Sequence, residues 1–411
     1  MPSFVAIDSA SSARFPDTVV EGVGTLPPVI YGGAMYICLV TGDDLGPTPL
    51  ACQIYKSTDL GNTWAIVDSG AGRSGTNSFF PIHDTVRNKI VVFSSDANGG
   101  IGTINVQEFD LATELWGSAA ATGPSGAMSK AYVFTDGTSK CYVCYQSATS
   151  RMFGALWSPG GGWASTDTDL SANCPAVGAG TGCRASVGIV DSSSVLHLFF
   201  LFSSSLFGTT RWAYQLVGTG LSLGTFKDLQ SLVGDLQDSV SFYSTPSIQG
   251  SKLLFYPEVN SLAGSGFGFP AILVGTPLSA PTWTEDNTTS IDPAFPGDTG
   301  LSPLHAPFSD VIAGVATVVY CSDGTGLSAT QRFKICRSSD LSTWTSDVLF
   351  GPFVPRFLCP WYGLDSGGNY TVFAAWNDTG VQPVNIAIVF PSAGSFGNSF
   401  RCCRIYSDPD S

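Results

Sequence analysis

The sequence predicts an all-β protein built from repeated four-stranded antiparallel units in a single domain, residues 1–411. Three observations lead to this fold class. The chain contains 47 glycines and 25 prolines, which suit many tight turns better than helices. Strand-sized apolar segments recur along the chain, and turns that end in an aromatic residue follow them at a regular distance. No break in composition indicates a second domain.

The repeat is defined by a very apolar segment that we expect to be the second strand of each unit. The seven segments are residues 36–40, 90–93, 141–145, 196–200, 253–256, 316–320 and 370–374. The aromatic residues that close the first six units are Trp64, Trp116, Trp163, Phe226, Trp283 and Trp344.

The closing aromatics are roughly 45–65 residues apart, within or slightly above the period of a propeller blade. Radial repetition also leaves few exposed sheet edges for so many strands. We therefore predict one β-propeller, with seven four-stranded blades preferred and six as the fallback. We expect residues 3–8 to form a strand that completes the last blade and closes the ring.

One turn between the third and fourth strands has a distinctive sequence that returns in a looser copy far downstream. Its aspartate is expected to accept hydrogen bonds from backbone N–H groups, and its glycine to supply a conformation that other residues resist. The tryptophan opens the next strand, where it can fill space between packed sheets. The motif residues are Ser57, Asp59, Gly61 and Trp64, and in the second copy Ser338, Asp340 and Trp344.

This pattern, S-x-D-x-G-x-T-W, resembles the Asp box, or BNR repeat, of sialidase-like β-propellers. In a propeller the Asp-box turns lie on the face opposite the loops between strands two and three. We therefore interpret Asp59 and Asp340 as structural turn residues and expect a functional site on the other face.

The expected site face collects most of the few arginines in the chain, which favours an anionic ligand. Arg14, Arg184 and Arg356, together with Trp361 in an expected Pro-Trp-Tyr loop, are the candidate ligand-binding residues. The sialidase resemblance implies further roles: arginines that grip a substrate carboxylate, a tyrosine nucleophile paired with a glutamate, and an aspartate acid. The catalytic candidates on this basis are Tyr362, Glu258, and Asp43 or Asp44.

Composition excludes several classes of function. The net charge of −14 disfavours nucleic acid and anionic membrane surfaces as partners. No apolar run reaches transmembrane length, and the N-terminal residues lack the apolar core of a signal peptide, so we expect neither membrane insertion nor a signal peptide. We expect no cofactor.

The eleven cysteines leave several pairings open. Cys38 with Cys52, and Cys321 with Cys336, lie on candidate neighbouring strands, and Cys174 with Cys183 flank a Gly-rich loop, so each pair could form a disulfide. Cys141 and Cys144 fall within one strand, where a zinc site would need a second pair, so we predict no metal. Buried free thiols are the simpler expectation.

We predict a non-catalytic binding or assembly module that acts at a surface, is extracellular or virion-associated, and recognises a glycan or protein partner on the propeller rim. A phage tail or capsid component of a larger particle would have this low charge and this Gly/Ser-rich composition. The alternative is a sialidase-like glycoside hydrolase acting on anionic sugars.

Overall fold

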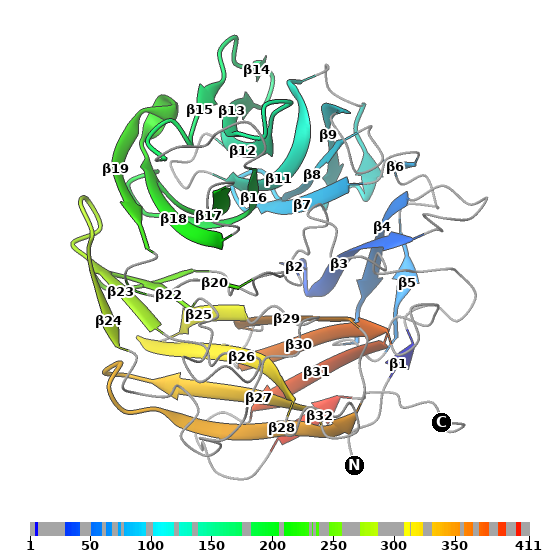
Figure 1. Cartoon of the computed structure of the whole chain (residues 1–411). Helices are drawn as coiled ribbons and strands as arrows, with labels where there is room; N and C mark the ends of the chain where they lie inside the picture. Colours follow the sequence, from blue (N-terminus) through cyan, green and yellow to red (C-terminus); the bar gives the residue numbers. More distant parts are fainter. Residues whose placement is uncertain are drawn as a thin grey trace.

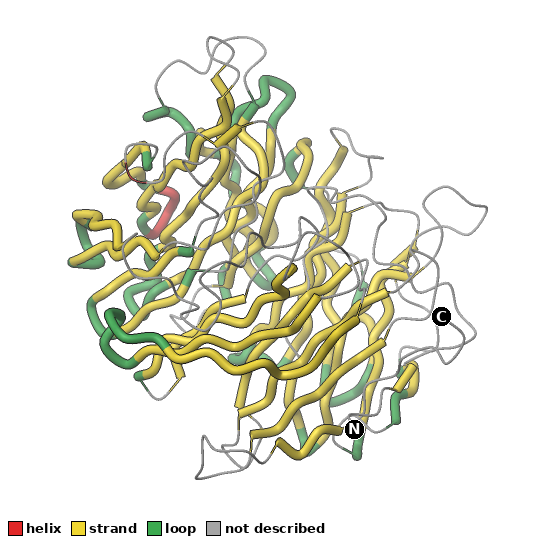
Figure 2. Tube along the Cα trace, turned by 60° about the horizontal axis from the view of Figure 1, so that its bottom comes forward, coloured by secondary structure: helices red, strands yellow, loops and turns green. Residues whose placement is uncertain are grey.

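The strands are arranged as sheets around a common centre, with the first strands of several sheets, such as β7, β16 and β25, toward the centre and β14, β24 and β28 at the outer edge (Figure 1). Most of the described backbone is strand, with loops and turns between the strands (Figure 2). The structure is a computed structural model that describes residues 5–6, 29–41, 51–59, 63–67, 73–74, 78–95, 102–118, 123–133, 139–174, 182–204, 209–229, 232, 236–237, 246–256, 272–286, 308–312, 314–323, 331–353, 357–364, 370–377, 385–391 and 400–403.

After β1 (Val5–Ala6), the described residues form seven consecutive runs of four antiparallel strands, some with an additional short strand. The first run contains β2 (Val29–Tyr31), β3 (Ala34–Thr41), β4 (Ala51–Ser57), β5 (Ala65–Ile66) and β6 (Arg73–Ser74). The second contains β7 (Ser78–Asp84), β8 (Lys89–Ser95), β9 (Gly102–Asp110) and β10 (Leu115–Trp116). The third contains β11 (Ser125–Val133), β12 (Cys141–Gln146), β13 (Met152–Ser158), β14 (Gly162–Trp163) and β15 (Thr168–Asp169).

The fourth run contains β16 (Cys183–Val190), β17 (Leu196–Ser204), β18 (Thr209–Val217), the 3-10 turn η1 (Thr219–Leu221), β19 (Leu223–Asp228) and β20 (Leu236–Gln237). The fifth contains β21 (Ser247–Gln249), β22 (Lys252–Phe255), β23 (Ile272–Thr276) and β24 (Thr282–Asp286). The sixth contains β25 (Phe308–Ile312), β26 (Val315–Asp323), β27 (Gln331–Ser338) and β28 (Thr345–Phe353). The seventh contains β29 (Phe357–Leu364), β30 (Tyr370–Asn377), β31 (Asn385–Pro391) and β32 (Phe400–Cys403).

Counted as continuous hydrogen-bonded sheets, the described strands form a six-bladed propeller, the number given above as the fallback. The largest sheet has nine strands and contains both the second and the third run. The two runs are joined where Ser125 and Gly126, at the start of β11, pair with Thr103 and Gly102 of β9. Our preferred count of seven blades therefore matches the number of runs and not the number of sheets.

The fourth position of a run is often occupied by two short pieces of strand. Both β5 and β6 pair with β4, both β14 and β15 pair with β13, and both β19 and β20 pair with β18. In the second run the same edge of β9 pairs with β10 at one end and with the start of β11 at the other. The nine-stranded sheet thus arises because the second piece continues directly into the next run.

The seven predicted apolar segments coincide with the second strands β3, β8, β12, β17, β22, β26 and β30, as the sequence predicts, except that Tyr256 lies one residue beyond the end of β22. The reason is visible in β8, where both faces of the strand are covered. Ile90 and Val92 pack in a cluster with the first run, whereas Val91 and Phe93 pack in a cluster with the third run. A strand buried on both faces must be apolar at successive positions.

Five of the six closing aromatics lie where the repeat places them, at or next to the start of the fourth strands, whereas Phe226 lies in the middle of β19. Trp283 and Trp344 are 8% and 5% exposed and belong to the clusters between neighbouring runs. Trp116 packs edge-on against Phe109, with ring centroids 5.3 Å apart. The expectation that these aromatics fill space between packed sheets is confirmed for these three residues.

The N-terminal strand β1 pairs with β31, so Val5 lies opposite Ile386 in the C-terminal sheet. This confirms that a strand within residues 3–8 joins the last run. The closed ring and the single domain of residues 1–411 stay predictions.

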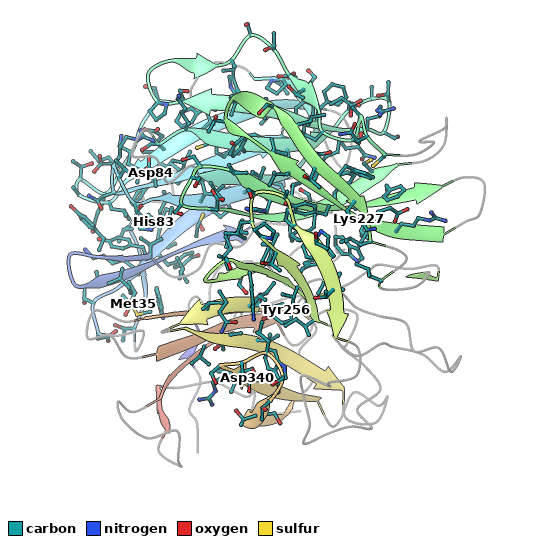
Figure 3. The ribbon with its side chains drawn as sticks, turned by 90° about the vertical axis from the view of Figure 1, so that its left-hand side faces the viewer. Met35, His83, Asp84, Lys227, Tyr256 and Asp340 are labelled. Atoms are coloured by element: carbon teal, nitrogen blue, oxygen red, sulfur yellow. The ribbon has the colours of Figure 1, made fainter. Side chains whose placement is uncertain are left out.

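Hydrogen bonds also link neighbouring runs through their turns. The Tyr142 hydroxyl of β12 donates to the Ser194 carbonyl in the turn of the fourth run at 2.9 Å. The Gln249 amide donates to the Gly314 carbonyl in the sixth run at 2.6 Å. Met35, near the β2–β3 turn of the first run, and Asp84, at the end of β7 in the second run, lie toward the same side of the molecule (Figure 3).

The register of the strands rules out one of the three open cysteine pairings. Cys321 lies opposite Phe333, whereas Cys336 lies opposite Val318, so the expectation that these two neighbours could bridge is wrong. Cys141 and Cys144 both lie in β12, as predicted, and belong to different core clusters.

Candidate functional site

The two motif turns are closed by their aspartates, as the residue types predict. Asp59 accepts hydrogen bonds from the Thr63 amide, the Thr63 hydroxyl and the Ser57 hydroxyl, each at 2.8 Å. Burial alone would raise the pKa of Asp59, but the hydrogen bonds from Thr63 and Ser57 outweigh it and hold this pKa below its usual value. Gly61 lies outside the described residues.

The Asp340 carboxylate closes its turn in the same way, by accepting from the Thr343 amide at 2.7 Å and the Ser342 amide at 2.9 Å. These backbone donors hold the pKa of Asp340 well below its usual value. A third turn of this kind escaped the sequence pattern: Asp110 accepts from the Ala112 and Thr113 amides in the β9–β10 turn. The shared signal is Asp-Leu followed by a threonine and then a tryptophan.

Most of the predicted site residues lie outside the described residues, namely Arg14, Asp43, Asp44, Glu258 and Arg356. Arg184 is the second residue of β16 and pairs with Leu201. Trp361 and Tyr362 lie within strand β29, opposite Phe373 and Val372, so placing them in a loop was wrong. The expected convergence of these residues on one rim stays a prediction.

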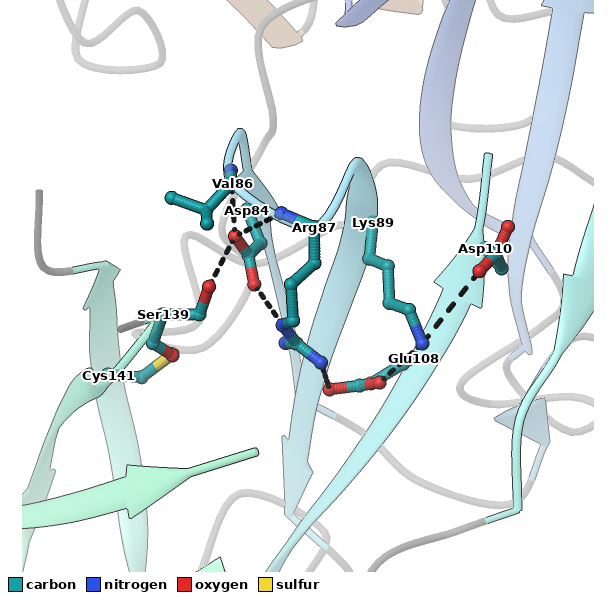
Figure 4. A network of polar contacts seen from close by, with 8 residues as sticks. All are labelled: Asp84, Val86, Arg87, Lys89, Glu108, Asp110, Ser139 and Cys141. Atoms are coloured by element: carbon teal, nitrogen blue, oxygen red, sulfur yellow. Dashed lines mark hydrogen bonds and ion pairs between the residues drawn. The ribbon is translucent and has the colours of Figure 1, made fainter. Parts of the chain in front are cut away.

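The most extensive polar network among the described side chains surrounds Asp84 at the end of β7 (Figure 4). One carboxylate oxygen accepts from the Val86 and Arg87 amides at 3.1 Å and from the Ser139 hydroxyl at 2.8 Å. The other accepts from Arg87 Nε at 2.6 Å. Arg87 and Lys89 also bind Glu108 at 2.6 Å and 3.0 Å. Asp84 and Glu108 are held by partners inside this network, and Ser139 belongs to the third run, so we interpret the network as a structural link between the second and third runs.

A second buried group, His197 in β17, also has a structural environment. Its Nδ1 lies 3.0 Å from the Tyr214 hydroxyl, and its Nε2 lies 3.4 Å from Asp191. Burial lowers the pKa of His197, against the opposing effect of Asp191. The sequence predicts a core or turn-facing histidine here, and its complete burial confirms this.

A surface groove of about 280 Å³ lies between the third and fourth runs. One wall comes from β13, β14 and the turn between them, and the other from η1 of the next run. The lining residues are Lys140, Leu156, Ser158, Gly161, Gly162, Trp163, Ala164, Thr219 and Gly220.

The groove is formed by turns between first and second strands and between third and fourth strands. In an antiparallel run these turns lie at the same end of the sheet, so the groove lies on the face of the Asp59 and Asp340 turns. This is the face that the sequence analysis placed away from a site. The groove was missed because its walls come from different runs and have no local motif.

Close packing against Gly123 and Phe93 fixes the position of the Trp163 ring. A Cβ atom on Gly123 would come within 2.4 Å of the Trp163 ring, so the glycine makes room for the indole. The ring also packs edge-on against Phe93, with centroids 6.0 Å apart. Gly160 and Gly162 both have φ +71°, which allows the tight turn that leads into the tryptophan.

Lys140 and the η1 turn are held by contacts behind the groove. Ser139, next to Lys140, donates to the buried Asp84, so the polar network in Figure 4 fixes the turn that carries the lysine. In η1, Leu221 is 4% exposed and packs into the core between the runs. Within the described part of the chain, Lys140 makes no ion pair.

The described lining residues offer one ammonium group, two hydroxyls, an indole and glycine-rich backbone, and no carboxylate, histidine or tyrosine is found among them. Hydrolysis of a glycosidic bond usually needs two carboxyl groups. An aromatic ring with a few polar groups around it is suited to binding an amphipathic ligand. The described lining of the groove therefore has groups suited to binding.

No group of three or more histidine, cysteine, aspartate or glutamate side chains that could hold a metal is present among the described residues. A search of the same residues for a helix long and apolar enough to cross a membrane finds none.

No protein-family model and no curated protein sequence matches this chain. Solved structures do match. The β-propeller domain of the Trilobed protease from Pyrococcus furiosus aligns with 94% of this chain and 99% of its own length, at 10% identity and a TM-score of 0.50. This likeness agrees with the β-propeller fold described above.

Proteins of different activities align at lower scores. The Trypanosoma rangeli sialidase aligns with 93% of this chain and 57% of its own, at 13% identity and a TM-score of 0.47. The fucose-specific lectin from Aleuria aurantia aligns with 96% of this chain and 97% of its own, at 8% identity and a TM-score of 0.47. Structural neighbours thus include both a glycosidase and a lectin, and this range does not select a function.

Proposed function

We propose that this β-propeller is a non-catalytic binding module and that the groove beside Trp163 binds a carbohydrate. The observation that carries the proposal is the composition of the groove, in which an indole, two hydroxyls and an ammonium group meet, with no carboxylate among the described lining residues. An indole offers a flat apolar surface to the C–H face of a sugar ring, and the hydroxyls and Lys140 can bind its oxygens. The volume of about 280 Å³ suits one sugar residue of a larger glycan.

The test is a glycan-array screen with the wild type and two tryptophan variants. Trp163→Ala removes the indole from the groove, and Trp116→Ala removes the equivalent closing aromatic of the second run, which does not line the groove. We expect Trp163→Ala to weaken binding at least tenfold, about 1.4 kcal/mol, whereas Trp116→Ala keeps wild-type affinity. Equal losses in both variants would contradict a role for the groove.

A fluorogenic sialoside assay on the same preparations tests the absence of catalysis. Binding without turnover supports the binding module. Turnover would instead support the sialidase-like hydrolase, in which Arg14, Arg184 and Arg356 grip an anionic sugar and Tyr362 with Glu258 attacks it.

We also propose that the nine-stranded sheet acts as two blades, giving seven blades of sialidase-like Asp-box type. The split outer strands of the runs and the three aspartate-closed turns support this reading. An experimental density map that resolves the full ring would test the count and the closure.

Finally, we propose that the protein acts outside the cell or on a virion, as a phage tail or capsid component. The composition supports this proposal, because charged residues make up 12% of the chain and small polar residues must therefore cover much of the surface. Co-sedimentation of the protein with intact particles in a density gradient tests this placement. Recovery in the soluble fraction alone would contradict it.

A further inference from the structure

Two cysteines of the first run have thiols in direct contact. Cys38 lies on β3 and Cys52 on β4, and their Sγ atoms are 2.7 Å apart. Cys38 pairs with Ile54, and Cys52 pairs with Val40, so the two cysteines are offset by two positions in the register. An offset of two keeps both side chains on the same face of the sheet as diagonal neighbours.

The distance between the sulfur atoms is too short for two independent thiols. Non-bonded carbon atoms are in optimal contact at roughly 3.5–4.0 Å, and sulfur is larger than carbon. A disulfide bond is about 2.04 Å long, so a small approach of the two atoms forms it without a change of register. Both residues are buried, at 5% and 0% exposed, among apolar neighbours such as Val29 and Ile90.

We propose that Cys38 and Cys52 form a disulfide that cross-links the second and third strands of the first run. The oxidant is a small-molecule disulfide of the glutathione class. One cysteine thiolate attacks this disulfide, forms a mixed disulfide and releases one reduced thiol. The second cysteine thiolate then attacks the protein sulfur of the mixed disulfide and releases the second reduced thiol. The two cysteines are oxidised, the reagent disulfide is reduced to two thiols, and the two cysteine protons end on those thiols.

The burial of the two thiols limits when the disulfide can form. In the folded protein the strands shield both sulfur atoms from the reagent, so thiol–disulfide exchange requires that the first run opens. We expect oxidation during folding or under conditions that open this run locally.

The chain provides an internal control in Cys141 and Cys144. These residues lie on one strand, and their side chains belong to core clusters on opposite faces of β12. They cannot approach each other while β12 is a strand. We therefore expect both to remain thiols under conditions that oxidise Cys38 and Cys52.

Peptide mapping separates the two pairs. Trypsin cleaves after Lys and Arg, so residues 15–56 form one peptide with Cys38 and Cys52, and residues 141–151 form another with Cys141 and Cys144. The full-length protein is incubated with oxidised glutathione in urea just below its unfolding midpoint and diluted into buffer to refold. Free thiols are then alkylated after denaturation, before digestion and mass spectrometry.

The proposal predicts a 15–56 peptide that is lighter by two hydrogen atoms than the reduced peptide and carries no alkyl group. The 141–151 peptide carries two alkyl groups. Cleavage at Asp43 or Asp44 should leave the two halves of the first peptide joined until a reductant is added. Two alkyl groups or two glutathione adducts on the 15–56 peptide would overturn the proposal.

A thermal measurement gives a second, independent readout. Oxidation should raise the melting temperature of the wild type, and this rise should be absent in Cys52→Ser. An equal rise in the variant would place the stabilising disulfide elsewhere and refute the assignment to Cys38 and Cys52.

Discussion

Replacing Asp84 with asparagine tests whether the network in Figure 4 holds the second and third runs together. The side chain of Asp84 is 1% exposed, and its two oxygens accept four hydrogen bonds. In one orientation the new amide NH₂ group faces Arg87 Nε, and in the other it faces two backbone N–H groups. Either orientation places a donor against a donor.

The expected cost follows from the loss of one partner of a buried ion pair, about 3–5 kcal/mol. Unfolding entropy of about 2.1 cal/mol/K per residue over 411 residues gives about 0.9 kcal/mol/K for cooperative unfolding of the whole chain. The melting temperature should therefore fall by about 3–6 °C in Asp84→Asn.

Two variants calibrate this result in a calorimetric or tryptophan-fluorescence melt at pH 7. Ser139→Ala removes one of the four donors to Asp84 and should cost about 1.5 kcal/mol, a smaller shift. Thr85→Ala changes an exposed residue of the same turn and should stay within about 0.5 kcal/mol of the wild type. The reasoning is refuted if Asp84→Asn melts at the same temperature as Thr85→Ala.

Three further outcomes are expected. The folded-state pKa of Asp59 is lowered, so the stability it adds is complete above about pH 4 and is lost as the pH falls further; Asp59→Asn should reduce the fall of the melting temperature between about pH 4 and 2, and the remaining fall comes from other carboxylates with lowered pKa values, such as Asp340. The folded-state pKa of His197 is also lowered, so stability should fall as the pH drops below about 6.5; His197→Gln should reduce this dependence, since burial also lowers the pKa of His83, and an unchanged profile would contradict the buried neutral imidazole. Gly123→Ala should displace the Trp163 ring, lower the free energy of unfolding by about 1–3 kcal/mol and weaken glycan binding. Tryptophan fluorescence and the glycan array measure these effects, and unchanged glycan affinity would show that binding does not depend on the position of the ring.

The strand pattern was largely predictable from the sequence, because each second strand is covered on both faces. Positions such as Ile90 to Phe93 are apolar without alternation, and this signal does not depend on distant residues. The closing aromatics were predictable because they recur at a regular distance along the chain, and Trp116, Trp283 and Trp344 fill space between packed sheets. Asp110 was missed because its turn lacks the serine and the exact spacing of the motif, although its hydrogen bonds are equivalent.

The groove could not be predicted in this way. Trp163 was found as a structural aromatic, but its neighbour Thr219 comes from the next run, and Lys140 is held by a network that begins at Asp84. Contacts between runs depend on how sheets stack, and stacking leaves no fixed spacing in the chain. For the same reason, strand register was needed to reject the pair Cys321 and Cys336.

The broken outer strands have a consequence for solubility. An exposed sheet edge is a template for pairing with another molecule, and proteins commonly protect such edges with charged side chains. Charged residues are scarce in this chain, at 12%. Pieces of two residues, such as β5, β14 and β15, are too short to offer a continuous ladder to a second copy. Where the outer strand is interrupted in this way, as in the first and third runs, the edge offers less for pairing with a second molecule than a continuous outer strand such as β28 does.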